Sequence, residues 1–191
     1  MPIRVKLCIL LPENLISGIS LINRSVLIIL PAQDFNEQEY LIIINALERS
    51  HVKVFIASDA YALCSGSNGL KVKNDMQLYN IHESNFGGII FIGGSGVRNY
   101  WNNSHLHSIA RKFHLKKKPV GAICAAPIIL AKAGIITECA TCYPDDKKEL
   151  ERTGVEYKDN PIIISNNIVT AKDPSSVGEF IKIFLNELAK N

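Results

Sequence analysis

Continuous apolar runs alternate along most of the chain with stretches in which apolar residues recur at helical spacing. The apolar runs lie at residues 25–30, 52–57, 85–92 and 119–123, and they are typical of parallel strands that are covered on both faces. Helical spacing is found at residues 35–50, 100–114 and 174–190. Because a strand, a helix and a parallel strand form a right-handed crossover, the pattern predicts an α/β fold. We expect a doubly wound, mostly parallel sheet in a three-layer α/β/α sandwich.

The first predicted helix, residues 35–50, begins with a capping residue and acidic side chains. Asn36 can accept a hydrogen bond from the first turn, and Glu37 and Glu39 suit the positive end of the helix dipole. We expect four apolar side chains to share its inner face: Leu41, Ile44, Ala46 and Leu47.

Glycine and asparagine predict the turns between shorter elements. Residues 65–69 contain two glycines and indicate a hairpin between short strands. Asn166 and Asn167 indicate a second hairpin, since asparagine tolerates a positive φ. Gly134 ends a helix that begins at Pro127, and residues 140–143 form a predicted short strand.

Length, charge and cysteine content narrow the class of protein. The 191 residues favour one domain at 25–191, preceded by an N-terminal extension of uncertain role at 1–24. The net charge is only +3, and the run at 116–118 suits a helix end, so no nucleic-acid partner is expected. No apolar run approaches 18 residues, so no membrane partner is expected. Five cysteines without framework spacing favour a reducing compartment, the cytoplasm.

Cys124 lies on a turn of small residues between the predicted strand 119–123 and the helix that Pro127 begins. A strand-to-helix turn of this kind, a nucleophile elbow, aims one side chain at the first N–H groups of the following helix. Those donors and the positive helix end favour thiolate over thiol. The alternative is a small buried cysteine in an alanine-rich turn, because free cysteine is among the most buried residue types.

Four short segments together resemble the ThiJ/PfpI superfamily: residues 122–127 (Ala-Ile-Cys-Ala-Ala-Pro), 92–94 (Ile-Gly-Gly), 141–144 (Thr-Cys-Tyr-Pro) and 57–58 (Ala-Ser). The similarity runs from about residue 25 to the C-terminus. It implies a flavodoxin-like fold, no cofactor, no metal, and a homodimer or a higher homo-oligomer.

The resemblance also implies roles for individual residues. Cys124 matches the nucleophile, which has a low pKa in the family, and Glu39 matches the helix glutamate beside it. The backbone N–H groups of Gly94 and Ala125 match the oxyanion hole. We also expect Gly93 and Tyr143 to take part in oxyanion or substrate binding, since the hydroxyl of Tyr143 can position a substrate. Two N–H donors stabilise an oxyanion as it forms, and a carboxyl beside a thiol can move its proton.

Two positions depart from the family pattern. Ala125 stands where protease-like members have His, and Tyr143 stands where deglycase-like members often have His. With these two departures, the resemblance implies a cofactor-independent glyoxalase III-like enzyme or protein deglycase, acting in stress protection on methylglyoxal, another small aldehyde or glycated proteins. The alternatives are an oxidation-sensing stress chaperone without catalysis and an intracellular cysteine peptidase or amidase.

Other side chains admit both a chemical and a structural interpretation. Cys139 and Cys142 form a C-x-x-C pair, but they lie at a predicted strand and not at a helix start. Arg98 follows the glycine loop and either binds a substrate carboxylate or is solvated. Trp101 marks a crevice wall or a dimer interface, and His105 and His107 are expected to be surface residues.

Overall fold

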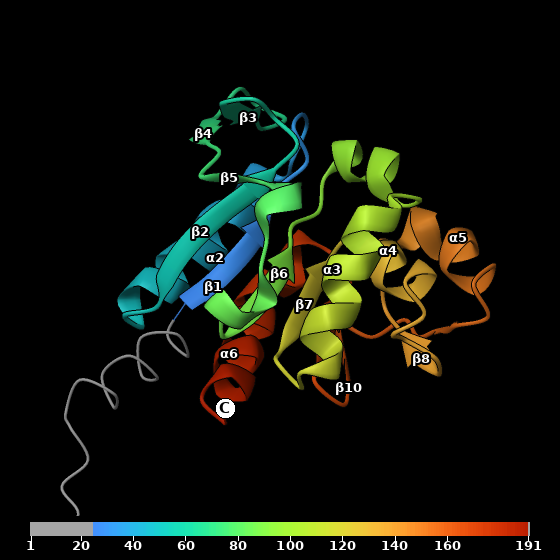
Figure 1. Cartoon of the computed structure of the whole chain (residues 1–191). Helices are drawn as coiled ribbons and strands as arrows, with labels where there is room; N and C mark the ends of the chain where they lie inside the picture. The colour runs from blue at the N-terminus through green and yellow to red at the C-terminus, as the bar shows by residue number, and fades with distance from the viewer. Residues whose placement is uncertain (1–24, 191) are drawn as a thin grey trace, which may run out of the picture.

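The structure is a computed structural model that describes residues 25–190, so the predicted N-terminal extension lies outside the described residues. Seven strands form the main sheet in the order β10-β11-β7-β6-β1-β2-β5 (Figure 1). Every neighbouring pair is parallel except β10 and β11. The predicted α/β fold with a doubly wound, mostly parallel sheet is therefore confirmed. The strands are β1 (Ser25–Ile29), β2 (Lys53–Ser58), β5 (Met76–Gln77), β6 (Gly88–Phe91), β7 (Val120–Ile123), β10 (Ile162–Ser165) and β11 (Ile168–Ala171).

Helices cover both faces of the sheet (Figure 1). One face is covered by α2 (Glu37–Arg49) and α6 (Val177–Leu188), which also pack against each other. The other face is covered by α3 (Ser104–Leu115) and α4 (Pro127–Lys132), with α5 (Lys147–Glu151) beside α4. Five 3-10 helices connect these elements: Leu78–Asn80, Glu83–Asn85, Ser95–Tyr100, Pro144–Asp146 and Pro174–Ser176. Among the described residues, no helix is both long and apolar enough to cross a membrane.

Two small sheets lie beside the main one. β3 (Leu63–Ser65) and β4 (Lys71–Lys73) form the predicted antiparallel hairpin. β8 (Cys139–Ala140) pairs in parallel with β9 (Glu156–Tyr157), which the sequence did not predict. The predicted strand at 140–143 is thus wrong beyond Ala140. The reason is that the Tyr143 N–H donates to the Cys124 carbonyl (2.8 Å) and so turns the chain toward the main sheet.

The predicted inner face of α2 is wrong in one important respect. The buried side chains are Glu39, Ile43 and Leu47, which are spaced four residues apart, whereas Leu41 is 54% exposed. Apolar counting could not reveal this, because the first residue of the buried row is an acid. The row places the Glu39 carboxyl at the carboxyl end of the sheet.

The helix predicted to start at residue 100 begins four residues later. Asn103 caps α3, because its side-chain oxygen accepts hydrogen bonds from the His105 and Leu106 N–H groups (3.0 and 3.1 Å). The residues before it form the 3-10 helix Ser95–Tyr100 directly after the glycine loop. This short helix keeps the loop at the carboxyl ends of β6 and β7.

Candidate active site

Cys124 lies between β7 and α4 with a φ of 61°, a left-handed conformation that non-glycine residues rarely adopt. Two backbone hydrogen bonds hold it there. Its N–H donates to the Ala171 carbonyl of β11 (3.0 Å), and its own carbonyl accepts from the Tyr143 N–H (2.8 Å). The residue is 7% exposed. A strained residue fixed in this way is typical of a functional position.

Glu39 is fully buried in the first turn of α2. Asn36 caps the helix, and its Oδ1 accepts from the Glu39 N–H (3.0 Å), as predicted. The carboxyl oxygen Oε2 accepts from the Gly93 N–H (2.9 Å), while Oε1 is buried without a hydrogen-bond partner among the described residues. Burial raises the pKa of Glu39 to about 7, and the nearby carboxylate of Asp173 adds to the rise.

The glycine loop allows Cys124 and Glu39 to come close to each other. A Cβ on Gly93 would lie 2.6 Å from Cys124 Cβ and 2.8 Å from Glu39 Oε2, so any side chain at this position would separate the two groups. The loop is tied to α2, because the Asn36 N–H donates to the Gly93 carbonyl (3.0 Å). Gly94 has a φ of 118°, which favours glycine.

Burial of Cys124 opposes the thiolate that its backbone N–H donors favour. Burial, and after it the carboxylate of Glu39, raises the pKa of Cys124 to about 12. The N–H groups of Gly94 and Ala125 do act on the sulfur and lower this pKa, but their effect is smaller than that of burial. Near neutral pH the sulfur therefore holds its proton, and Glu39 is the group that titrates.

A tyrosine, an arginine and a tryptophan lie around the nucleophile. The guanidinium of Arg98 lies over the Tyr143 ring, 5.9 Å from its centroid. Arg98 Nε and Nη2 donate to the two carboxylate oxygens of Asp146 (2.9 and 3.0 Å). Trp101 Nε1 donates to the Ala125 carbonyl (2.8 Å), so the indole is tied to the residue that follows the nucleophile.

Asp146 and Asp173 were not singled out from the sequence. Asp146 ends the 3-10 helix that follows Tyr143, and Asp173 lies just beyond β11, where the chain leaves the carboxyl end of that strand. The sequence shows only that each acid comes shortly after an apolar stretch. The tertiary contacts are what distinguish these two acids from acids that are exposed to solvent.

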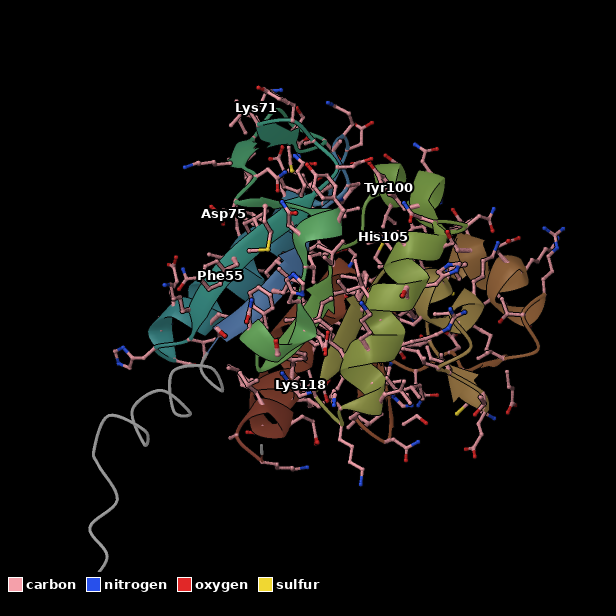
Figure 2. The ribbon with its side chains drawn as sticks, viewed as in Figure 1. Phe55, Lys71, Asp75, Tyr100, His105 and Lys118 are labelled. Atoms are coloured by element: carbon pink, nitrogen blue, oxygen red, sulfur yellow. The ribbon has the colours of Figure 1, made fainter. Side chains whose placement is uncertain are left out.

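His105 is exposed, as expected of a surface residue, and His107 is half-buried. His105 Nε2 contacts the Leu78 carbonyl (3.0 Å), and His107 Nε2 contacts the Trp101 carbonyl (2.9 Å). Figure 2 shows His105 on α3, below Tyr100, which precedes that helix. The Tyr100 hydroxyl donates to Asp59 (2.6 Å). These contacts join the segment after the glycine loop to neighbouring loops.

The C-x-x-C pair is present as two free cysteines, with Cys142 fully buried and Cys139 half-buried. Burial raises the pKa of Cys142 to about 12. In residues 25–190 no group of three or more His, Cys, Asp or Glu side chains is arranged to hold a metal ion.

A family model described as the DJ-1/PfpI family matches residues 24–187. The chain belongs to the DJ-1/PfpI family. Deglycase PH1704 of Pyrococcus horikoshii is 29% identical over 160 residues, covering 83% of this chain and 96% of the relative. The glutathione-independent glyoxalase DJR-1.2 of Caenorhabditis elegans is 28% identical over 157 residues, covering 82% of this chain and 84% of the relative. A ThiJ/PfpI domain protein from Brachyspira murdochii has the same fold, with a TM-score of 0.85 at 24% identity, covering 88% of this chain and 98% of that one.

Proposed function

We propose that this protein is a cofactor-independent enzyme of the glyoxalase or protein deglycase type, with Cys124 as nucleophile and Glu39 as general base. The observation that carries the proposal is the pairing of an elbow cysteine with a fully buried carboxyl whose pKa is about 7. A general base is most effective when its pKa is close to the working pH. The names of the family relatives, deglycase and glyoxalase, support the same class of reaction.

The first step is addition of the Cys124 sulfur to the aldehyde carbon of methylglyoxal. The Glu39 carboxylate takes the thiol proton as the carbon–sulfur bond forms, and the carbonyl electron pair moves to oxygen. The N–H groups of Gly94 and Ala125, which act on the sulfur in the free site, are suited to bind that oxygen. The oxygen then takes a proton from Glu39 and a hemithioacetal results.

The second step moves a proton between two carbon atoms. The Glu39 carboxylate removes the hydrogen on the carbon bound to sulfur, and the proton is returned to the neighbouring carbon by way of an enediol. This gives a thioester of lactate, which water cleaves to lactate and the free thiol. Methylglyoxal and one water are thus converted to lactate, with no oxidant or reductant required. Oε1 of Glu39 is suited to this transfer because it has no partner among the described residues.

The two alternatives find less support in the site. Peroxide reacts with thiolate, and burial raises the pKa of Cys124, which disfavours a sensor that oxidises readily in the free site. A peptidase of the protease-like pattern needs a histidine beside the nucleophile. Ala125 occupies that position, and both His105 and His107 are tied to backbone carbonyls.

We further propose that the protein works in the cytoplasm as a homodimer. The four described cysteines are free, which suits a reducing compartment. On α2, Leu41 and Ile42 are 54% and 36% exposed, and they line a groove of about 720 Å³ against α6. An apolar groove on the helix that carries Glu39 is suited to a second copy of the chain.

The test is lactate formation from methylglyoxal by the wild type, by Cys124→Ser and by Cys142→Ser. We expect Cys124→Ser to lose turnover, because the hydroxyl is a far poorer nucleophile at this position. Cys142→Ser should retain turnover, since Cys142 is buried outside the Cys124–Glu39 pair. A wild type that forms no lactate, or a Cys124→Ser variant that forms it at the wild-type rate, would overturn the proposal.

A further inference from the structure

Arg98 uses only one edge of its guanidinium within the described structure. Nε and Nη2 form a two-pronged contact with Asp146, whose side chain is 7% exposed, whereas that of Arg98 is 37% exposed. A guanidinium has five N–H donors, and this contact uses two of them. The opposite edge, formed by Nη1 and the second N–H of Nη2, donates to no other described residue. Asp146 therefore fixes the orientation of a cation that keeps a free hydrogen-bonding edge.

That cation is connected to the nucleophile through Tyr143. The guanidinium lies over the ring of Tyr143, and the N–H of the same tyrosine donates to the carbonyl of Cys124 (2.8 Å). The charge of Arg98 is close enough to interact with Cys124. The Tyr143 hydroxyl likewise forms no hydrogen bond with the other described residues, so the ring under Arg98 also has an unused donor.

Three carboxyl groups lie near Cys124 or Arg98. Glu39 is close enough to raise the pKa of Cys124, and Asp173 is close enough to raise the pKa of Glu39. Asp146 forms an ion pair with Arg98. An anionic substrate would be repelled by these carboxylates unless one group offset them. The free edge of Arg98 has the geometry that pairs with two carboxylate oxygens. Since Asp146 already offsets much of the charge, a singly charged carboxylate suits this position better than a doubly charged phosphate.

We propose that Arg98 anchors a carboxylate on the substrate, so that the substrate class is a 2-oxoaldehyde that carries a carboxylate group. The inference rests on the proposed function and deepens it. The aldehyde carbon is attacked by Cys124 as described above, while Arg98 binds the distant carboxylate and takes no part in bond making. The product is the corresponding 2-hydroxy acid with its second carboxylate intact, formed with the uptake of one water.

The first measurement compares kcat/KM for 4,5-dioxopentanoate and for methylglyoxal. Hydrogen bonds to a charged group contribute enough for a preference of about 10- to 100-fold for the carboxylated aldehyde. In Arg98→Lys the ammonium can still pair with Asp146, but it has no second pair of N–H groups for the substrate carboxylate. The ratio of the two kcat/KM values should therefore fall to about one. The double variant Arg98→Gln with Asp146→Asn removes both charges and covers the case in which a single change disturbs folding. Arg49→Lys, at the far end of α2, is the matched control and should keep the wild-type ratio.

The second measurement needs no turnover. Binding of 4-oxopentanoate and of neutral 2-pentanone to Cys124→Ser is followed by calorimetry, with and without Arg98→Lys. Arg98-dependent binding of the anion supports the anchor, and equal binding of the two compounds overturns it. If both aldehydes are consumed equally well, the anchor fails and the proposed function stands. If neither is consumed while the anion still binds through Arg98, the proposed function fails and the anchor stands.

Discussion

Replacing Glu39 by glutamine should remove the part of the pH dependence of folding stability that the Glu39 carboxyl causes. The Glu39 carboxyl is fully buried, and its pKa rises from 4.5 to about 7 on folding. Between these two values the folded state binds more protons at this residue than the unfolded state. The stability that Glu39 contributes is therefore fully present below pH 4.5 and is lost as the pH rises through about 7.

The size of the effect follows from the two pKa values. A change from 4.5 to about 7 corresponds to about 3 kcal/mol of unfolding free energy. Glutamine can still accept from the Gly93 N–H but never ionises, so it lacks this loss. Its amide N–H₂ is buried where Oε1 has no described partner, which costs about 1–3 kcal/mol at every pH. Glu39→Gln should therefore be less stable than the wild type in acid. Its unfolding free energy should rise relative to that of the wild type as the pH rises, because only the wild type loses stability at Glu39.

Urea unfolding from about pH 4 to about pH 8 measures this difference, because the other titrating groups are common to both proteins. The free energy of unfolding of Glu39→Gln minus that of the wild type should increase by about 3 kcal/mol across the range. A matched substitution, Glu48→Gln on the exposed side of α2, should show no such increase. A difference for Glu39→Gln that stays constant within about 1 kcal/mol would refute the assignment of a buried, proton-holding carboxyl.

Two further substitutions test the geometry of the site. Gly93→Ala places a Cβ 2.6 Å from Cys124 Cβ and should cost about 1–3 kcal/mol of stability together with most of the methylglyoxal turnover. Gly178→Ala, where nothing lies within 4 Å of the added Cβ, should keep the turnover in lactate assays and should not lower the stability in denaturation assays, because alanine is the better helix former. Asp173→Asn removes a carboxylate that raises the pKa of Glu39, so the midpoint of the pH–rate curve should move to lower pH; a midpoint that stays in place or moves up would contradict this electrostatic role.

The sheet was predictable because its signals are local. Buried parallel strands appear as continuous apolar runs, and the turn residues have the backbone that the sequence indicated. Asn166 has a φ of 54° and Gly134 a φ of 71°, for example. The elbow at Cys124 was predictable for the same reason, since a strand, small residues and a proline follow one another directly. β5 and β9, with two residues each, carry too little pattern to be recognised.

The electrostatic state of the site was not predictable from the sequence. The donors that should favour a thiolate at Cys124 were identified correctly, but burial and the charge of Glu39 outweigh them. Both effects depend on how closely α2 and the glycine loop pack, which is a tertiary property. Leu41 illustrates the same limit: it fits an apolar stripe on α2, yet the sheet faces the row that begins with Glu39. Asp146 is likewise an ordinary acid in the sequence and a buried partner of Arg98 in the fold.

The most direct test of the Cys124–Glu39 mechanism is the pH dependence of kcat/KM for methylglyoxal in the wild type and in Glu39→Gln. If the Glu39 carboxylate removes the thiol proton, wild-type kcat/KM rises as the pH passes through about 7 and then levels off. Glu39→Gln should lack this rise and should be slower by about 100-fold or more above the midpoint. A wild-type profile that is flat across neutral pH, or a rise that persists unchanged in Glu39→Gln, would contradict the mechanism.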